Sequence, residues 1–449
     1  MVSTRRAIRT RTQSQPTKIT AASTVPEEDS SGDALCSTPH KRRKTQTVRS
    51  TPPSHPLRKP VRQTTVRHNT TATPTLLDGK LVLFSLQDPD PLIRATLRAR
   101  PSTRNKSPYV ADVRLDGEDG REALLHVPNL DMGGKCVVGK TLLIKPARTN
   151  KGELVGAEAV SPKYQTPKCE FHAQLLYVDE QEYTQRHPDP PTNGDIPADD
   201  DVPEKIHYPP TWVGAHPALG ERIARCWLEH NLVEGIPAVT ALRTQVRNPC
   251  GTDMRVDFLV THADHTQRII EVKTVVDTDY AVDATPPAVP ASGKRPKKSC
   301  VFVSHVRPYT RTAIFPWGNS NQKGPDGEAV VSTRAIHHVR ELTRIARERL
   351  CWWSPSEEEE EEDKVKTTST PLLTTILFVV IRGDATAFAP NIQACPSFAR
   401  YLREAHDAGV QVLAKRVRWG VDEHEGVCVD DDMLPIVWPT PESRREQSP

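Results

Sequence analysis

The sequence lacks paired cysteines. Its nine cysteines are scattered and odd in number, and no two of them are spaced as Cys-x-x-Cys. This pattern argues against a disulfide framework and against a zinc ribbon, and it favours a reducing compartment. Long apolar runs are also missing: none approaches the roughly 20 residues that span a bilayer, and no stretch has the apolar core of a signal peptide. We therefore expect a soluble, intracellular protein with no membrane partner.

An overall excess of positive charge is absent as well. The formal net charge is +3, but the first 75 residues hold 14 Lys and Arg against four acids, and the remaining residues hold 46 against 53. Overall charge therefore gives no argument for a nucleic-acid partner. The Lys and Arg side chains that release counterions when a protein binds nucleic acid would have to lie in the N-terminal arm or in a local patch.

Residues 1–75 are rich in Ser, Thr, Pro and Arg and poor in aliphatic residues, which predicts a disordered basic tail. Within this tail PHKRRK, at residues 39–44, is typical of nuclear import signals. The first 23 residues hold no acid and also suit a mitochondrial transit peptide, and a solvated tail that no receptor reads is the third interpretation. We favour nuclear targeting.

From residue 76 the sequence consists of short β-favouring runs separated by turn residues. The runs lie at 77–86, 91–100, 109–117, 121–129, 140–147 and 153–160. Five or six such strands in this space predict a small closed barrel of OB type over residues 76–177. Barrels of this type often bind single-stranded nucleic acid, although such a barrel can also be purely structural.

An acidic, Pro-rich linker follows at residues 178–205. The next segment, 206–419, alternates helices and strands in the order α-β-β-β-α-β-α-β, with insertions at 277–331 and 354–368. Helices are expected at 219–232, 332–350 and 397–409. This order predicts a mixed sheet covered by helices. Residues 420–449 are expected to form a C-terminal tail.

Two neighbouring strands of that sheet carry charges inside apolar runs. In RVDFLV the acid is Asp257, and in IIEVKTV the charged residues are Glu271 and Lys273, which share a face because they are two apart. A hairpin through residues 261–267 would bring all three to one side. Two carboxylates and a neighbouring carbonyl suit a hard cation such as Mg²⁺, or Mn²⁺, and a lysine beside them can position a water. This is the arrangement for metal-assisted phosphodiester hydrolysis.

An ordinary solvent-facing or edge strand explains a Glu and a Lys two apart equally well, and D-x₁₃-E-x-K alone is a weak motif. The surroundings favour catalysis. An amphipathic helix that offers Glu221 precedes the strands, both acids lie in apolar runs, and a cross-over helix follows. Together these features look like the PD-(D/E)xK nuclease core.

The chain also resembles the sugar fermentation stimulation proteins from about residue 81 to residue 418, with large insertions. The matching stretches are, in order, YVADVRLDG, HVPNLDM, WVGAHPALGERI, RVDFLV, IIEVKTV, AIFP, STRAIHHVREL and the long run from ILFVVIRG to LAKRV. The resemblance implies an α+β protein in which an N-terminal OB-like β-barrel precedes a restriction-endonuclease-like, PD-(D/E)xK α/β domain. It also implies an association with DNA.

Carried over residue by residue, the resemblance assigns the metal-site acids to Asp257 and Glu271 and the site lysine to Lys273. The family's other matching positions are Arg222, Arg334, His338 and Glu341 on helices and His126, Pro128 and Asn129 in the barrel. Of these, Arg222, Arg334, His338, His126 and Asn129 are the expected DNA contacts. The chain departs from the family at His216 and Pro217, which replace Asn-Thr, and at Glu221, which replaces an asparagine and adds a third candidate acid.

The sequence thus predicts a DNA-binding protein with a Mg²⁺-dependent nuclease-like site, in which Glu221 assists. A non-catalytic DNA-binding module with the same fold is the alternative, and an interaction protein whose charges form a buried ion-paired network is the third interpretation. Whether the DNA is single- or double-stranded, and whether the protein forms a homodimer, stays open.

Overall fold

The structure is a computed structural model that describes most of the chain from residue 75 onward. The described ranges are 64–65, 75–117, 120–128, 132–179, 210–280, 310–318, 320–352 and 370–439. Most of the expected basic tail, with the cluster at 39–44, lies outside the described residues, as do most of the acidic linker, parts of both insertions and residues 440–449. Within the described ranges, no helix combines the length and the apolar character that a membrane crossing requires.

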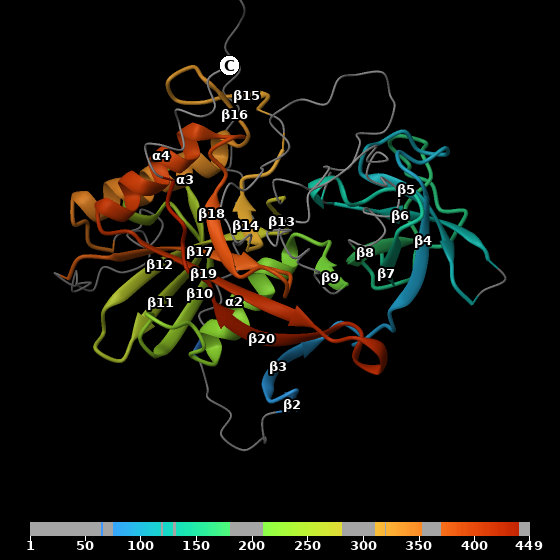
Figure 1. Ribbon diagram of the computed structural model, residues 1–449, viewed down its shortest axis with the longest axis horizontal. Helices are drawn as coiled ribbons and strands as arrows, with labels where there is room; N and C mark the ends of the chain where they lie inside the picture. Colours follow the sequence, from blue (N-terminus) through green and yellow to red (C-terminus); the bar gives the residue numbers. More distant parts are fainter. Residues whose placement is uncertain are drawn as a thin grey trace, which may run out of the picture. The chain divides into compact units, whose positions relative to one another are not determined.

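Five short strands close into a barrel. In chain order they are β4 (Ile93–Ala99), β5 (Val110–Leu115), β6 (Glu122–His126), β7 (Thr141–Pro146) and β8 (Phe171–Val178). They pair in the order β6-β5-β4-β7-β8, and a parallel contact between β6 and β8 closes the ring. Alternate residues fill the interior, so Leu97, Val113 and Leu142 are fully buried. The predicted OB-like barrel is confirmed (Figure 1).

Two details of the predicted barrel are wrong. The run at 77–86 forms β2 (Leu76–Leu77) and β3 (Lys80–Ser85), and β3 pairs with β20 (Val427–Met433) of the large sheet instead of a barrel strand. The run at 153–160 forms no strand and leaves Leu154 and Val160 exposed. The fifth barrel strand is β8, because its longer alternating run supplies Phe171, Ala173 and Leu175 to the interior.

A nine-stranded mixed sheet organises the rest of the described chain. Its remaining strands are β1 (Thr64–Thr65), β10 (Val239–Arg247), β11 (Arg255–His262), β12 (Gln267–Val275), β17 (Leu373–Val380) and β19 (Gln411–Trp419). The order across the sheet is β1-β10-β11-β12-β17-β19-β20-β3-β2. The central strands β12, β17 and β19 are parallel, and both flanks are antiparallel. The predicted mixed sheet is therefore present.

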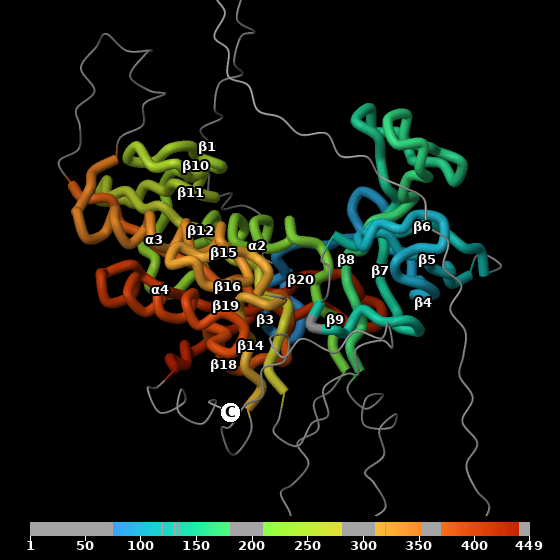
Figure 2. Tube along the Cα trace, turned by 90° about the horizontal axis from the view of Figure 1, so that it is seen from above, coloured from blue at the N-terminus to red at the C-terminus, as the bar shows by residue number. Residues whose placement is uncertain are grey.

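Three helices cover the two faces of this sheet. They are α2 (Ala218–Glu229), α3 (Thr333–Arg347) and α4 (Pro396–Asp407). Phe258 and Ile270 of the β11–β12 hairpin share a hydrophobic core with α2, whereas Leu259 and Ile269 share one with α3 and α4. Figures 1 and 2 show α3 and α4 side by side. The strand alternation thus sends neighbouring residues of one hairpin into two separate cores.

Helix starts follow local chemistry. Ser332 caps α3, since its side chain accepts a hydrogen bond from the Ala335 amide. The start of α2 lies tight against β12, because an added Cβ at Gly220 would lie 1.9 Å from Thr274 Oγ1. Glycine is required at this position to bring the first turn of α2, with Glu221, close to the strand that carries Glu271.

The smaller elements connect these parts. They are β9 (Thr211–Gly214), β13 (Asp277–Thr278), β14 (Thr312–Phe315), β15 (Gln322–Lys323), β16 (Ala329–Val330) and β18 (Ala387–Pro390), with 3₁₀ turns η1 (Met132–Gly134), η2 (Pro249–Gly251) and η4 (Asp422–His424). Strand β9 extends the barrel beside β8 and leads directly into α2. The barrel and the sheet accordingly share one continuous hydrophobic core on the α2 side.

The expected C-terminal tail is also wrong over much of its length. Strand β20 lies within residues 420–449 and pairs on one side with β19 and on the other with β3. It is held there by Cys428 and Val429, which are buried, and by ion pairs of its acids, such as Asp431 with Arg416. The expected tail at 1–75 differs in one place, where β1 pairs with β10.

Candidate functional site

The β11–β12 hairpin brings Asp257 and Glu271 together. Its register pairs Thr261 with Gln267 and Phe258 with Ile270. One step further along, Asp257 and Glu271 would oppose each other, and the ladder ends there. Instead of a backbone partner, the Val272 amide donates to Asp257 Oδ2 at 2.8 Å. The Asp257 side chain therefore lies between the two strands, next to the strand that carries Glu271 and Lys273.

Glu271 is buried, with 3% of its surface exposed. Its Oε1 accepts hydrogen bonds from Lys273 Nζ and from His338 Nδ1, both at 2.5 Å. Burial alone would raise the pKa of Glu271, but the charge of Lys273 and the hydrogen bond from His338 outweigh it and hold that pKa below its ordinary value. Glu271 is therefore a carboxylate at neutral pH.

One oxygen of this carboxylate is left over. Glu271 Oε2 is buried and has no hydrogen-bond partner among the described residues. A buried polar oxygen without a partner costs about 1–3 kcal/mol, more if it is charged. The side chain of Glu271 thus presents an unsatisfied anionic oxygen at the place where the two strands separate.

Asp257 has the opposite electrostatics. Burial, and then the charge of Glu271, raise the pKa of Asp257 from 3.8 to about 7, against the opposing effect of the Val272 amide. Two carboxyl groups that share a site cannot both ionise cheaply, so one holds its proton to higher pH. A cation between them would remove that penalty.

Glu221 reaches this pair through an intermediary that the sequence reasoning missed. Gln245 of β10 donates from Nε2 to Glu221 Oε2 at 2.8 Å and to Asp257 Oδ1 at 3.3 Å. Its backbone φ of 55° lies in the left-handed region, which is strained for a residue with a side chain. Strands β10 and β11 pair Val246 with Val256 next to their turn. One residue further from the turn on each strand, Gln245 is opposite Asp257, so the hairpin register could have identified it.

The other predicted DNA contacts lie in different settings. His338 is 4% exposed and its Nδ1 is hydrogen-bonded to Glu271, so it orients this acid, and its contact with phosphate stays a prediction. Arg334 is exposed in the first turn of the same helix. Arg222 is exposed, with its guanidinium 3.8 Å from the centroid of the Phe84 ring. Glu341 pairs with Arg344 at 3.2 Å.

In the barrel, His126 lies on β6 and its Nδ1 is 3.3 Å from Nδ1 of His172 on β8. Burial lowers the pKa of His126, which favours a neutral imidazole at neutral pH. Asn129, the other predicted barrel contact, lies outside the described residues. His126 thus faces another imidazole and the junction with the sheet, where His216 follows β9.

A metal at this site would have two carboxylates as its protein ligands. In the described ranges, no group of three or more His, Cys, Asp or Glu side chains is arranged to hold a metal ion. Mg²⁺, however, usually takes only one or two carboxylates and keeps several waters. The unsatisfied Glu271 Oε2 and the raised pKa of Asp257 are the features that a cation would relieve, so the residues present fit such an ion.

Comparisons with known proteins give one consistent family. The family model described as "Sugar fermentation stimulation protein RE domain" matches residues 365–423. A sugar fermentation stimulation protein homolog from a Cyanothece species is 26% identical over 220 residues, which are 49% of this chain and 63% of that protein. Homologs from Synechococcus elongatus and Geobacter sulfurreducens are 23% and 24% identical and cover 70% and 73% of this chain, and 86% and 90% of their own lengths.

A solved structure is similar as well. It is the structure of Pyrococcus furiosus SfsA in complex with Ca²⁺, which is 14% identical, has a TM-score of 0.44, and is matched over 80% of this chain and 99% of that one. The matched part of this chain spans 63% and 64% of the length of two of the curated relatives. The family model and the agreement among the curated relatives support the assignment of this chain to the sugar fermentation stimulation protein family.

Proposed function

We propose that this protein binds DNA and hydrolyses its phosphodiester bonds with a divalent cation, Mg²⁺ or Mn²⁺, held by Asp257 and Glu271. One observation carries the proposal. The buried Glu271 lies beside Lys273 and close enough to the part-buried Asp257 to raise the pKa of Asp257 to about 7, and Glu271 Oε2 is unsatisfied. Groups with strongly perturbed pKa values cluster at functional sites.

When bound, the cation would stabilise the charge that develops on the phosphate oxygens. The protein's own residues supply the positioning. The Lys273 ammonium lies 2.5 Å from Glu271 and can orient the attacking water beside the pair. His338 fixes the Glu271 carboxylate from α3, and Gln245 fixes Asp257 and links it to Glu221. Supporting contacts of this kind hold metal ligands in place.

DNA as the polymer is supported by the family's association with DNA and by the OB-like barrel, a fold that often binds nucleic acid. Arg334 and Arg222 are exposed cations on the two helices nearest the hairpin and suit phosphate contacts. We extend the proposal to the nucleus as the compartment, on the basic cluster at 39–44 alone.

A non-catalytic DNA-binding module is the second candidate, and a specific observation favours it. Glu271 already has two cationic or hydrogen-bonding partners, Lys273 and His338, on the same oxygen. A buried carboxylate that is paired in this way needs no metal to keep its charge. The two candidates therefore differ in whether the second oxygen of Glu271 takes a cation.

Calorimetric titration with Mg²⁺ and Mn²⁺, together with cleavage assays on single- and double-stranded DNA, separates them. We expect wild-type protein to bind the cation and cleave, and Asp257→Asn and Glu271→Gln to lose both. Cleavage should fall at least about 100-fold, since loss of a supporting partner alone costs 10–100-fold. Asp264→Asn is the matched control, because Asp264 lies exposed in the turn of the same hairpin.

Two results would count against the enzyme. If wild-type protein takes up no divalent cation, or if the Asp257 and Glu271 variants cleave as wild type does, hydrolysis at this site is excluded. DNA binding that survives in both variants but weakens steeply with salt would then favour the binding module.

A further inference from the structure

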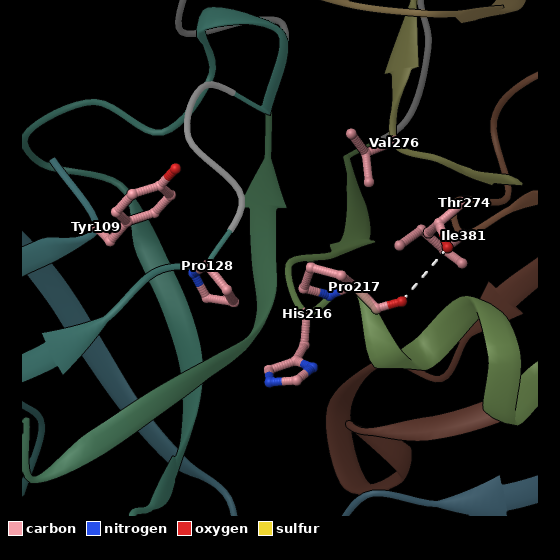
Figure 3. A pocket seen from close by; sticks show the side chains of 7 residues that line it. All are labelled: Tyr109, Pro128, His216, Pro217, Thr274, Val276 and Ile381. Carbon is pink, nitrogen blue, oxygen red and sulfur yellow. Dashed lines mark hydrogen bonds between the residues drawn. The ribbon is translucent and has the colours of Figure 1, made fainter. Parts of the chain in front are cut away.

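A pocket of about 350 Å³ lies where the barrel meets the sheet. Its lining is Tyr109, Pro128, His216, Pro217, Thr274, Val276 and Ile381. Figure 3 shows Tyr109 and Pro128 on one side, and Pro217, Thr274, Val276 and Ile381 on the other. The pocket is thus built by the barrel, the start of α2, the end of β12 and the residue that follows β17.

The chemistry of this lining suits a flat, mostly apolar group with a polar edge. One aromatic ring, two proline rings and two aliphatic side chains form most of it, and none of the lining residues is charged like Lys or Arg. The polar groups are the Thr274 hydroxyl and the His216 imidazole. His216 accepts the Ala218 amide at Nδ1, so its proton lies on Nε2, which can donate. A nucleobase has this combination of flat face and polar edge.

The sheet side of the pocket is held by main-chain contacts. The Ile381 amide donates to Val275 O at 3.0 Å, and the Gly214 amide donates to Ile381 O at 2.9 Å. The two segments pack closely, since a Cβ added at Gly214 would lie 2.5 Å from Ile381 Cδ1. Thr274 is fixed in turn by a hydrogen bond to Pro217 O at 3.4 Å, drawn in Figure 3. The pocket is therefore preformed on this side.

Tyr109 forms the opposite side and is 41% exposed. Its backbone is tied down, since its amide donates to Ser107 Oγ and its carbonyl accepts the Val127 amide. The ring is thus free to stack while its position is fixed. Exposed aromatic rings in this setting stack bases and contribute to the binding of single strands without regard to sequence.

The pocket and Glu271 of the acidic pair lie along the same strand, on its two faces. Thr274 directly follows Lys273 on β12, and by alternation it points to the α2 side while Glu271 and Lys273 point to the α3 side. A base in the pocket therefore belongs to a nucleotide other than the one whose phosphate would lie at Glu271. The pocket has room for a base, and a base of a stacked duplex would have to leave the stack to enter it.

We infer that this pocket binds one unpaired nucleobase, so that the DNA acted on is single-stranded or carries an unpaired nucleotide; this rests on the proposed function. The inference is tested with the full-length protein and EDTA, which prevents cleavage. A fluorescein-labelled single strand and the matching duplex are titrated and followed by anisotropy.

Tyr109→Ala should weaken binding of the single strand about tenfold, because it removes one stacked base. Tyr109→Phe, which keeps the ring, should bind as wild type does, and the duplex should be unaffected by either change. Tyr164→Ala is the matched control, since Tyr164 is an exposed tyrosine, 67% accessible, on another loop of the barrel. Equal single-strand affinity of Tyr109→Ala and wild type, or equal losses for single strand and duplex, would overturn the inference.

A second measurement needs no variant. A single strand with 2-aminopurine at successive positions should lose fluorescence at one position when wild-type protein binds, because that base stacks in the pocket. Unchanged fluorescence at every position would overturn the inference even if a Tyr109 variant failed to fold. Wild-type protein that binds and cleaves DNA while these tests fail refutes the pocket alone, whereas wild-type protein that binds no DNA refutes the proposed function with it.

Discussion

Two buried acidic sites lie in this one sheet domain, and they are arranged in opposite ways. Asp384, which follows β17, accepts hydrogen bonds from two nitrogens of one guanidinium. Arg382 Nε donates to Oδ1 and Arg382 Nη2 donates to Oδ2, each at 2.6 Å. Arg311 donates to Oδ2 as well. Burial works against the charge of Asp384, but the two arginines outweigh it and hold its pKa far below the ordinary value. Every oxygen of this carboxylate is satisfied.

The pair at Asp257 and Glu271 lacks that balance. One acid has an oxygen without a partner, and the other has its pKa raised by burial and by its neighbour. The side chains of Glu271 and Asp384 are equally buried, with 4% exposed in each, so burial alone does not distinguish these two acids. At Asp384 the buried charge is balanced within the fold, whereas Asp257 and Glu271 leave a charge that the described side chains balance only in part, which is the condition under which a bound cation would be favourable.

The largest effect on stability is expected at the paired site. Asp384→Asn should lower the free energy of unfolding by about 3–5 kcal/mol, because it removes the carboxylate that faces two buried guanidinium groups. Urea denaturation measures this loss, and calorimetry on the folded variant should still detect the cation. If Asp384→Asn were as stable as wild type, the contrast between the two sites would fail.

The like-charged pair should respond to pH instead. In EDTA-treated protein, Asp257 has a folded-state pKa of about 7 against 3.8 unfolded, so its proton stabilises the fold below about pH 4 and that contribution is lost as the pH rises to 7. Relative to Asp257→Asn, wild type should lose about 1.4 kcal/mol per pH unit across this interval. Thermal unfolding of both proteins at a series of pH values measures the difference.

If the difference in stability between wild type and Asp257→Asn stays constant from pH 4 to pH 7, Asp257 ionises normally. The electrostatic argument for a cation would then be removed. Asp264→Asn serves as the control, since Asp264 is exposed and hydrogen-bonded to Thr266, with a pKa below its ordinary value. Its removal should leave the slope between pH 5 and pH 7 unchanged.

Much of this site could be predicted from sequence because it is local. Alternation along two adjacent strands places Asp257, Glu271 and Lys273 on one hairpin, and a hairpin register needs little more than the turn length. The helices α2, α3 and α4 also lie within a few residues of the predicted ranges, since amphipathic spacing and the Ser332 cap are local signals.

The parts that sequence reasoning missed depend on distant contacts. Strand β3 pairs with β20 across more than 300 residues, and no local pattern favours that partner over a barrel strand. The hydrogen bond between His338 and Glu271 was not predicted, because it depends on how α3 packs on the sheet. The pocket is likewise formed by segments far apart in sequence, which meet only in the folded chain.

Replacement of His338 should have an intermediate effect, on the affinity for the cation. His338→Gln removes the imidazole that orients Glu271 from α3 but leaves both carboxylates in place. The affinity for Mg²⁺ should fall about 10–100-fold, as is usual for the loss of a partner behind a metal ligand. Calorimetric titration measures this change. His337→Gln is the matched control, because His337 neighbours it but contacts Asp253 O instead. Equal losses in both variants would mean that the helix, and not the Glu271 contact, is responsible.

The smallest effect is expected where pairing occurs without burial. Arg403 and Asp407 of α4 form an ion pair one helical turn apart, with both side chains more than half exposed. Replacing Asp407 by Asn should change the free energy of unfolding by no more than about 0.5 kcal/mol, because water screens the charge and both side chains lose freedom when they pair. Urea denaturation of Asp407→Asn and Asp384→Asn, carried out in parallel, measures the loss of unfolding free energy in each. A similar loss of stability in the two variants would mean that pairing alone matters. A large loss confined to Asp384→Asn would assign the effect to burial, a property that Glu271 shares with Asp384.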